Sequence, residues 1–187
     1  MKTIYKSIFG FLSIALFFNC SEPEDIYMGS KNIKASNLIQ IETLPSYKLN
    51  DLVYINASFS RYLPEEGYTD LLDIYNTTKS KEYSFDFLLE KKSAYETWTP
   101  INIGNKIVVN KGKSYGINSN IGICVFNPES NKYEFRAGIP LLETGEFRLR
   151  ISNNLYPLDT NSSNISVHIY TTISQVDDQG YYSFKVN

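Results

Sequence analysis

From residue 38 onward, the chain consists largely of short segments in which apolar and polar residues alternate. The clearest segment runs from Glu82 to Glu90, and Leu88 is its only departure from strict alternation. A β-strand points successive side chains to opposite faces of a sheet, so this pattern predicts a strand with one buried face. The residues predicted to face the core in this segment are Tyr83, Phe85, Phe87 and Leu89.

The same alternation recurs in further segments, which are separated by residues that favour turns. After Cys20, no segment keeps a sustained helical period. Short strands spaced by turns favour an all-β fold, and we predict an antiparallel β-sandwich, immunoglobulin-like or a related Greek key, of about nine to eleven strands. We place this single domain at residues 38–187. The further segments are Val53–Phe59, Tyr133–Ile139, Glu146–Ile151 and Ile165–Ile173.

The segment Ile121–Phe126 differs because it is apolar at nearly every position. Such a run predicts a strand in the middle of the sheet that is covered on both faces. It contains Cys124, one of only two cysteines in the chain, which we expect to be a small buried apolar side chain.

The last segment, Asp178–Val186, reads D-x-G-x-Y-x-F-x-V. It resembles the D-x-G-x-Y-x-C-x-V strand of immunoglobulin-like domains, with Phe184 at the position of the cysteine. Read from Asp177, it is also similar to a hairpin of carboxypeptidase-regulatory-like sandwiches. The resemblance implies a sandwich and no particular function. Independently of it, Asp177–Gly180 predicts a type I turn closed by a glycine bulge.

The first twenty residues are organised as an export signal. Lys2 and Lys6 precede an apolar run from Ile8 to Phe18. This run is shorter than the roughly 20 apolar residues that span a bilayer, so residues 1–19 predict a signal peptide.

Cys20 closes the apolar run as the last residue of Phe17–Cys20, which resembles the lipobox of bacterial lipoproteins. The acidic Ser21–Asp25 that follows is similar to the corresponding segment of surface-exposed lipoproteins from Bacteroidetes-type bacteria. The resemblance implies lipidation of Cys20 and an outer-membrane location, facing either the cell surface or the periplasm. The alternative is an ordinary secretory signal that is cleaved elsewhere. Residues 20–37 keep no period, which predicts a flexible tether between the lipid and the domain.

Charge argues against a nucleic-acid partner. The chain carries 18 basic and 20 acidic residues, a formal net charge of −2, and its lysines are scattered. Nucleic-acid binding depends on neutralising phosphates with clustered basic residues. We therefore expect the membrane, through the lipid on Cys20, and a glycan or envelope protein as partners.

Patterns that indicate catalysis are sparse. The single histidine, His168, falls on a predicted polar face, and no serine lies in a G-x-S-x-G motif. We find no cysteine pair spaced for zinc and no phosphate-binding glycine loop, and we expect neither enzymatic activity nor a metal or cofactor. Carboxylate pairs that could serve a glycoside hydrolase are Glu65 with Glu66, Asp70 with Asp73, and Glu143 with Glu146.

Aromatic residues are the remaining candidates for a binding site. The chain has fifteen Tyr, eleven Phe and one Trp, and four of these rings lie outside the alternating pattern, namely Tyr62, Tyr68, Tyr95 and Trp98. Exposed rings in loops can stack on sugars or anchor a protein partner. The alternative is that Trp98 fills the core and the tyrosines cap its edges.

These observations favour a lipid-anchored binding or accessory module of the cell envelope that recognises a glycan or a neighbouring envelope protein. A structural or assembly lipoprotein of an envelope complex is the main alternative. A carboxylate-based glycoside hydrolase has less support, because residues adjacent in turns are usually solvated turn formers.

Overall fold

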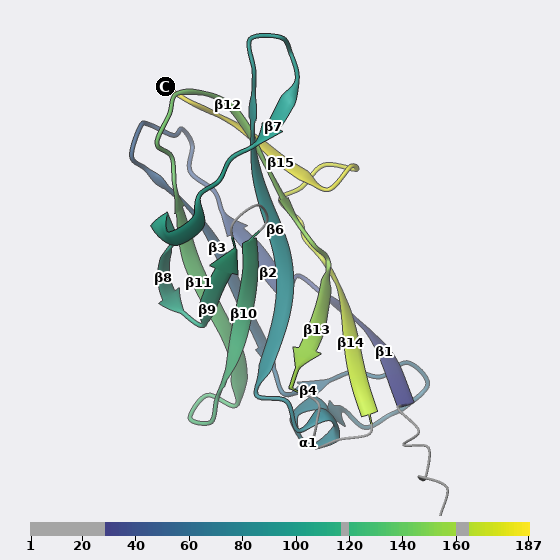
Figure 1. Cartoon of the computed structure of the whole chain (residues 1–187). Helices are drawn as coiled ribbons and strands as arrows, with labels where there is room; N and C mark the ends of the chain where they lie inside the picture. The colour runs from purple at the N-terminus through teal and green to yellow at the C-terminus, as the bar shows by residue number, and fades with distance from the viewer. Residues whose placement is uncertain (1–28, 117–119, 160–164) are drawn as a thin grey trace, which may run out of the picture.

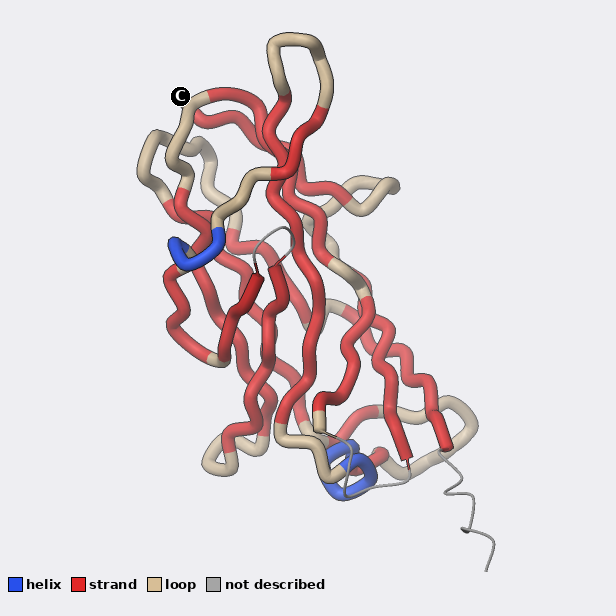
Figure 2. The backbone as a smooth tube through the Cα atoms, in the orientation of Figure 1, coloured by secondary structure: helices blue, strands red, loops and turns tan. Residues whose placement is uncertain are grey.

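The computed structural model describes residues 29–116, 120–159 and 165–187 (Figure 1). The signal peptide, Cys20 and the first part of the predicted tether lie outside these ranges. Strands dominate the described chain (Figure 2), which confirms the all-β class. The strands are β1 (Gly29–Ser36), β2 (Ile39–Glu42), β3 (Leu52–Ser60), β4 (Tyr62–Leu63), β5 (Leu72–Asp73), β6 (Glu82–Lys92), β7 (Trp98–Pro100), β8 (Val108–Lys111), β9 (Lys113–Gly116), β10 (Asn120–Asn127), β11 (Lys132–Pro140), β12 (Gly145–Ile151), β13 (Asn154–Leu158), β14 (Ile165–Thr172) and β15 (Tyr181–Val186), and the helices are α1 (Ile74–Thr78) and a 3₁₀ turn at Gly104–Lys106.

Thirteen of these strands form a single curled sheet, with β4 and β5 as a separate two-stranded ribbon. The main path runs β1-β14-β13-β6-β10-β11-β3-β2, and the remaining strands attach along it. The strand β1 pairs parallel to β14, so the sheet is mixed, whereas a purely antiparallel arrangement was predicted. The predicted nine to eleven strands were also too few. In the described residues, no helix has the length and hydrophobicity needed to cross a membrane.

The two ends of the strand path, β1 and β2, are joined by only Asn37 and Leu38. Asn37 has a φ of 55° and donates its backbone N–H to Thr172 of β14 at 3.0 Å. Leu38 accepts a backbone hydrogen bond from Ser58 of β3, so this corner links strands from opposite ends of the path. The prediction of a flexible tether up to residue 37 is therefore wrong for residues 29–36, which pair with β14 along the whole of β1.

The core lies inside the curl and follows the predicted alternation. Tyr83, Phe85, Phe87 and Leu89 of β6 are all buried, as expected. The rings of Phe59, Tyr83 and Tyr133 pack with centroids 5.0 to 5.9 Å apart, which combines large buried apolar areas with favourable ring geometry. Glu90 is buried as well, and its charge is compensated by Arg148, whose Nε donates to the carboxylate at 2.7 Å.

The strands β8 and β9 form a wedge between β10 and β11. The strands β10 and β11 pair with each other near the turn that joins them. Farther from this turn they separate, and β10 pairs with β9 while β11 pairs with β8. Gly112 at the tip of the wedge has a φ of 74°, and a Cβ there would lie 2.3 Å from the carbonyl oxygen of Ile123. Only glycine fits this position without displacing backbone.

The strand β10 lies in the middle of the sheet, as predicted, but its outer face is covered only in part. Cys124 is completely buried, and burial raises the pKa of its thiol. On the opposite face, Ile123 is 5% exposed and buried, whereas Ile121, two residues earlier, is 38% exposed. The prediction of two covered faces therefore holds at Ile123 and Cys124 and fails at Ile121.

Candidate functional site

The main groove of the described residues forms where one stretch of chain changes its neighbours. The strands β12 and β13 both pair with β6 and are separated only by Ser152 and Asn153. On its other side, β12 pairs with β15, whereas β13 pairs with β14. Because β14 and β15 have different neighbours here, a groove forms that is lined by the end of β14, the 177–180 turn and parts of β6 and β12.

The groove has a volume of about 700 Å³. This lies within the usual range of roughly 300 to 1,000 Å³ for small-ligand sites. Phe87, Ile151 and Ile173 provide buried apolar side chains along it. Among its exposed polar residues, Thr172 and Asp177 accept hydrogen bonds from the backbone. We call the other exposed polar and aromatic residues that line it the groove set, which consists of Asp86, Arg150, Tyr170, Asp178 and Gln179.

Arg150 differs from the other three arginines of the chain. Each of the others binds a carboxylate and stacks against at least one ring: Arg61 with Asp73, Arg136 with Glu42, and Arg148 with Glu90. Within the described part of the chain, the Arg150 guanidinium has no hydrogen bond, ion pair or ring contact. Five N–H donors of a rigid, charged group are therefore directed to solvent in the groove.

The other members of the groove set are unpartnered in the same way. Among described residues, the side chains of Asp86, Asp178 and Gln179 take part in no hydrogen bond or ion pair, and the Tyr170 hydroxyl has no partner either. Tyr170 is 46% exposed. The groove thus combines acceptors, donors and an accessible ring around an apolar wall, which suits a ligand that carries several hydroxyl groups.

Asp177 supports the turn beside the groove. Its carboxylate accepts backbone hydrogen bonds from Gln179 and Tyr181, both at 2.9 Å. Gly180 follows with a φ of 83°, and its N–H donates to the carbonyl of Asp177. The predicted tight turn closed by a glycine is present here, and it holds Asp178 and Gln179 at the groove.

The four aromatic residues singled out from the sequence do not form one site. Tyr95 and Trp98 belong to the β6–β7 hairpin, whereas Tyr62 and Tyr68 lie at the opposite end of the molecule near α1 (Figure 1). Trp98 is half-buried outside the core, with the Arg148 guanidinium 4.6 Å from its ring centroid. Tyr95 is 90% exposed at the hairpin tip.

His168 lies on the outer face of β14, as expected, and is half-buried. Its ring contacts Tyr156 edge-on, with centroids 5.1 Å apart. The described residues contain no cluster of three or more histidine, cysteine or acidic side chains that could hold a metal ion.

Each candidate carboxylate pair has a member that is held by a neighbouring basic side chain. Glu65 pairs with Lys31 at 2.5 Å, and Asp73 pairs with Arg61. Glu143 and Glu146 pair with Lys91 and Lys92. For Asp73, hydrogen bonds from Arg61 and Asn76 outweigh partial burial and hold the pKa below its ordinary value, whereas a general acid has to be protonated near neutral pH.

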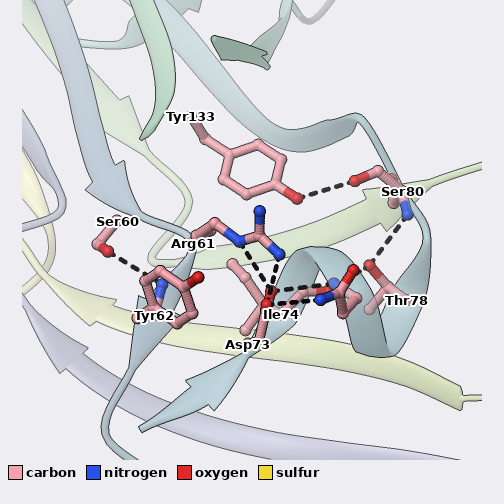
Figure 3. A network of polar contacts seen from close by, with 9 residues as sticks. Ser60, Arg61, Tyr62, Asp73, Ile74, Thr78, Ser80 and Tyr133 are labelled. Carbon is pink, nitrogen blue, oxygen red and sulfur yellow. Dashed lines mark hydrogen bonds and ion pairs between the residues drawn. The ribbon is translucent and has the colours of Figure 1, made fainter. Parts of the chain in front are cut away.

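The ion pair of Arg61 is the centre of a closed polar cluster (Figure 3). Arg61 Nε donates to Asp73 at 3.0 Å, and Asp73 also accepts the backbone N–H of Asn76 and thereby caps α1. Nearby, the Tyr133 hydroxyl donates to the backbone carbonyl of Ser80 at 2.8 Å. Because these groups already have partners, the cluster fixes the ribbon and α1 to the sheet and leaves little for a ligand.

The groove set could not be identified from the sequence. Asp86, Arg150 and Tyr170 are polar-face residues of three different strands, and the alternation correctly places them outside the core. Their convergence depends on which strands pair and where β14 diverges from β15, and alternation contains no information on either. Comparisons of the chain with protein-family models, with curated proteins and with solved structures gave no match.

Proposed function

We propose that this protein is a lipid-anchored binding module of the cell envelope that holds a glycan in the groove. The observation that carries the proposal is the set of unpartnered donors and acceptors around Tyr170, beside an apolar wall. The other three arginines, in contrast, are each paired with a carboxylate.

A glycan matches the chemistry of this set. Carboxylates such as Asp86 accept hydrogen bonds from sugar hydroxyls, and the Arg150 guanidinium donates to hydroxyl and ring oxygens. The apolar face of a sugar ring packs against a tyrosine ring such as that of Tyr170. Acidic and basic groups occur together, which favours a neutral sugar chain over a strongly charged one.

The location in the envelope is supported by the leader and by Cys20. Lipid on this residue supplies more than one acyl chain, which is what stable membrane attachment requires. In this proposal the protein is not an enzyme, and its sheet is a curled relative of the immunoglobulin-like or Greek-key sandwich. An assembly role with a protein partner is the second candidate, because Tyr95 at the hairpin tip is almost fully exposed.

The proposal is tested by titrating the purified protein against a panel of soluble microbial and plant polysaccharides, with calorimetry as the readout. For any polysaccharide that binds, Arg150→Ala, Asp86→Asn and Tyr170→Ala should each weaken the affinity by about tenfold or more, equivalent to about 1.4 kcal/mol. Arg150→Lys should lose much of the affinity too, since one ammonium cannot replace the planar fork of donors.

Tyr115→Ala is the matched control, because Tyr115 is an exposed strand tyrosine that does not line the groove. It should bind as the native protein does. Folded groove variants that retain native affinity would disprove the site. Failure to bind any glycan, together with co-purification of one envelope protein, would favour the assembly role.

A further inference from the structure

Exposed apolar and aromatic side chains gather at the end of the molecule where β1 begins. We call Tyr62, Tyr68, Leu71 and Ile165 the basal surface, and their exposed fractions are 45%, 68%, 58% and 36%. Ile165 pairs with Gly29, the first residue of β1, and Tyr62 belongs to the ribbon beside α1. Figure 1 shows the ribbon, α1 and the starts of β1 and β14 together at one end.

Contacts with β1 hold the loop that carries Tyr68 against this end. Lys31 of β1 pairs with Glu65 at 2.5 Å, and its Nζ lies 5.4 Å from the centroid of the Tyr68 ring. Two bonds between Arg61 and Asp73 fix the start of the ribbon. The basal surface is therefore a fixed part of the fold.

The charges near the basal surface are mixed. Lys31 and Arg61 are paired with acids, and the exposed charged groups around them are Glu66 and Asp70 on the loop and Lys79 after α1. Tyrosines beside basic side chains, without a strong net charge, are typical of surfaces that meet the headgroup region of a membrane.

The position of Cys20 in the sequence determines which end of the molecule is near the lipid. Only eight residues lie between Cys20 and Gly29, so nine Cα-to-Cα steps join them. Fully extended, they reach at most about 30 Å. An acyl group on Cys20 therefore holds Gly29, at the basal surface, within about 30 Å of the bilayer, whereas the β6–β7 hairpin lies at the far end of the molecule (Figure 1).

We propose that the basal surface rests on the bilayer that holds the lipid of Cys20, with Tyr62, Tyr68, Leu71 and Ile165 inserted among zwitterionic headgroups. This inference depends on the lipid anchor of the proposed function. In this orientation the β6–β7 hairpin points away from the membrane, and the anchored domain has one defined face toward the lipid.

The single native tryptophan, Trp98, permits a direct test. The full-length lipidated protein is reconstituted into phosphatidylcholine and phosphatidylethanolamine vesicles, with or without bromine on the acyl chains of the phosphatidylcholine. Three proteins are compared: the native protein, Trp98→Phe with Tyr68→Trp, and Trp98→Phe with Tyr95→Trp. The last is the matched control, because Tyr95 is also an exposed tyrosine but lies at the far end.

Brominated lipid should remove most of the emission of the indole at position 68 and leave the emission from positions 95 and 98 unchanged. Aqueous iodide should quench the indole at position 95 more strongly than the indole at position 68. Equal quenching at positions 68 and 95, or no quenching at position 68 in vesicle-bound protein, would overturn the orientation alone. Native protein that carries no acyl group and does not float with vesicles would overturn the anchor as well.

Discussion

Two regions of the molecule hold an arginine beside aspartate and tyrosine side chains, and they differ in whether those groups already have partners. In the cluster around Arg61, Asp73 is bound by the guanidinium and by two groups of Asn76. In the groove, Arg150, Asp86 and Tyr170 have no such partners within the described residues, although they face a common space.

The comparison shows how similar residues serve stability in one place and recognition in another. A polar group that is partnered inside the fold contributes to the free energy of unfolding, and its removal leaves another group unsatisfied. A polar group that faces a groove contributes little to folding and remains available to a ligand. The two regions should therefore respond in opposite ways to matched substitutions.

The largest difference is expected between Asp73→Ala and Asp86→Ala. The first removes the cap of α1 and leaves the guanidinium of Arg61 half-buried and unpaired, which should lower the free energy of unfolding by about 2 kcal/mol. The second should change it by less than about 0.5 kcal/mol. Urea unfolding followed by circular dichroism measures both, and equal losses would contradict the distinction between the two regions.

A smaller difference is expected between two tyrosines that lose only a hydroxyl. Tyr133→Phe removes a buried hydrogen bond to the carbonyl of Ser80 and should cost about 1 kcal/mol. Tyr170→Phe removes a hydroxyl without a partner in the described chain and should leave the midpoint of urea unfolding unchanged. If Tyr170→Phe were the more destabilising of the two, the groove would hold a structural contact.

The smallest effect is expected from acid. Partial burial of Asp73 opposes its ionisation, but hydrogen bonds from Arg61 and Asn76 outweigh burial and hold its pKa below the ordinary value of 3.8. The stabilisation from this carboxylate is complete above the pKa of the unfolded chain and is lost as the pH falls through the lower folded pKa. Between pH 6 and about pH 2, the free energy of unfolding should therefore decline less steeply in Asp73→Asn than in the native protein.

The lowered pKa values of Glu42 and Glu134 contribute a similar acid loss in both proteins, so only the difference between them reports on Asp73. A native profile that matched Asp73→Asn throughout would mean that Arg61 does not stabilise the ionised carboxylate.

Alternation along single strands predicted the all-β class and the buried face of β6, because it reports directly on side-chain direction. The burial of Cys124 was predicted from its continuous apolar segment, and the turn at Asp177 from its turn-forming residues. Alternation gave no information on β1, where Lys31, Asn32 and Lys34 suggested an unstructured tether, since that strand buries mainly Ile33. The groove was not predictable either, because its residues meet only through pairings between strands that are distant in sequence.

The aromatic candidates illustrate a further limit of sequence reasoning. Tyr62, Tyr68 and Tyr95 lie outside the alternating pattern, and their side chains are exposed. Sequence separation gave no indication that Tyr62 and Tyr95 lie at opposite ends, since β3 and the long β6 run along the length of the sheet between them (Figure 1).

The two-residue corner at Asn37 and Leu38 has a consequence for how the chain acquires its shape. Asn37 binds Thr172, which lies 135 positions later in the sequence. All of β1 likewise pairs with β14, so it cannot be paired before β14 has been made. During synthesis from the N-terminus, β1 stays without this neighbour until residues 165–172 have been made. Closure of the sheet is thus a late event, and contacts of such long sequence range make it a slow one.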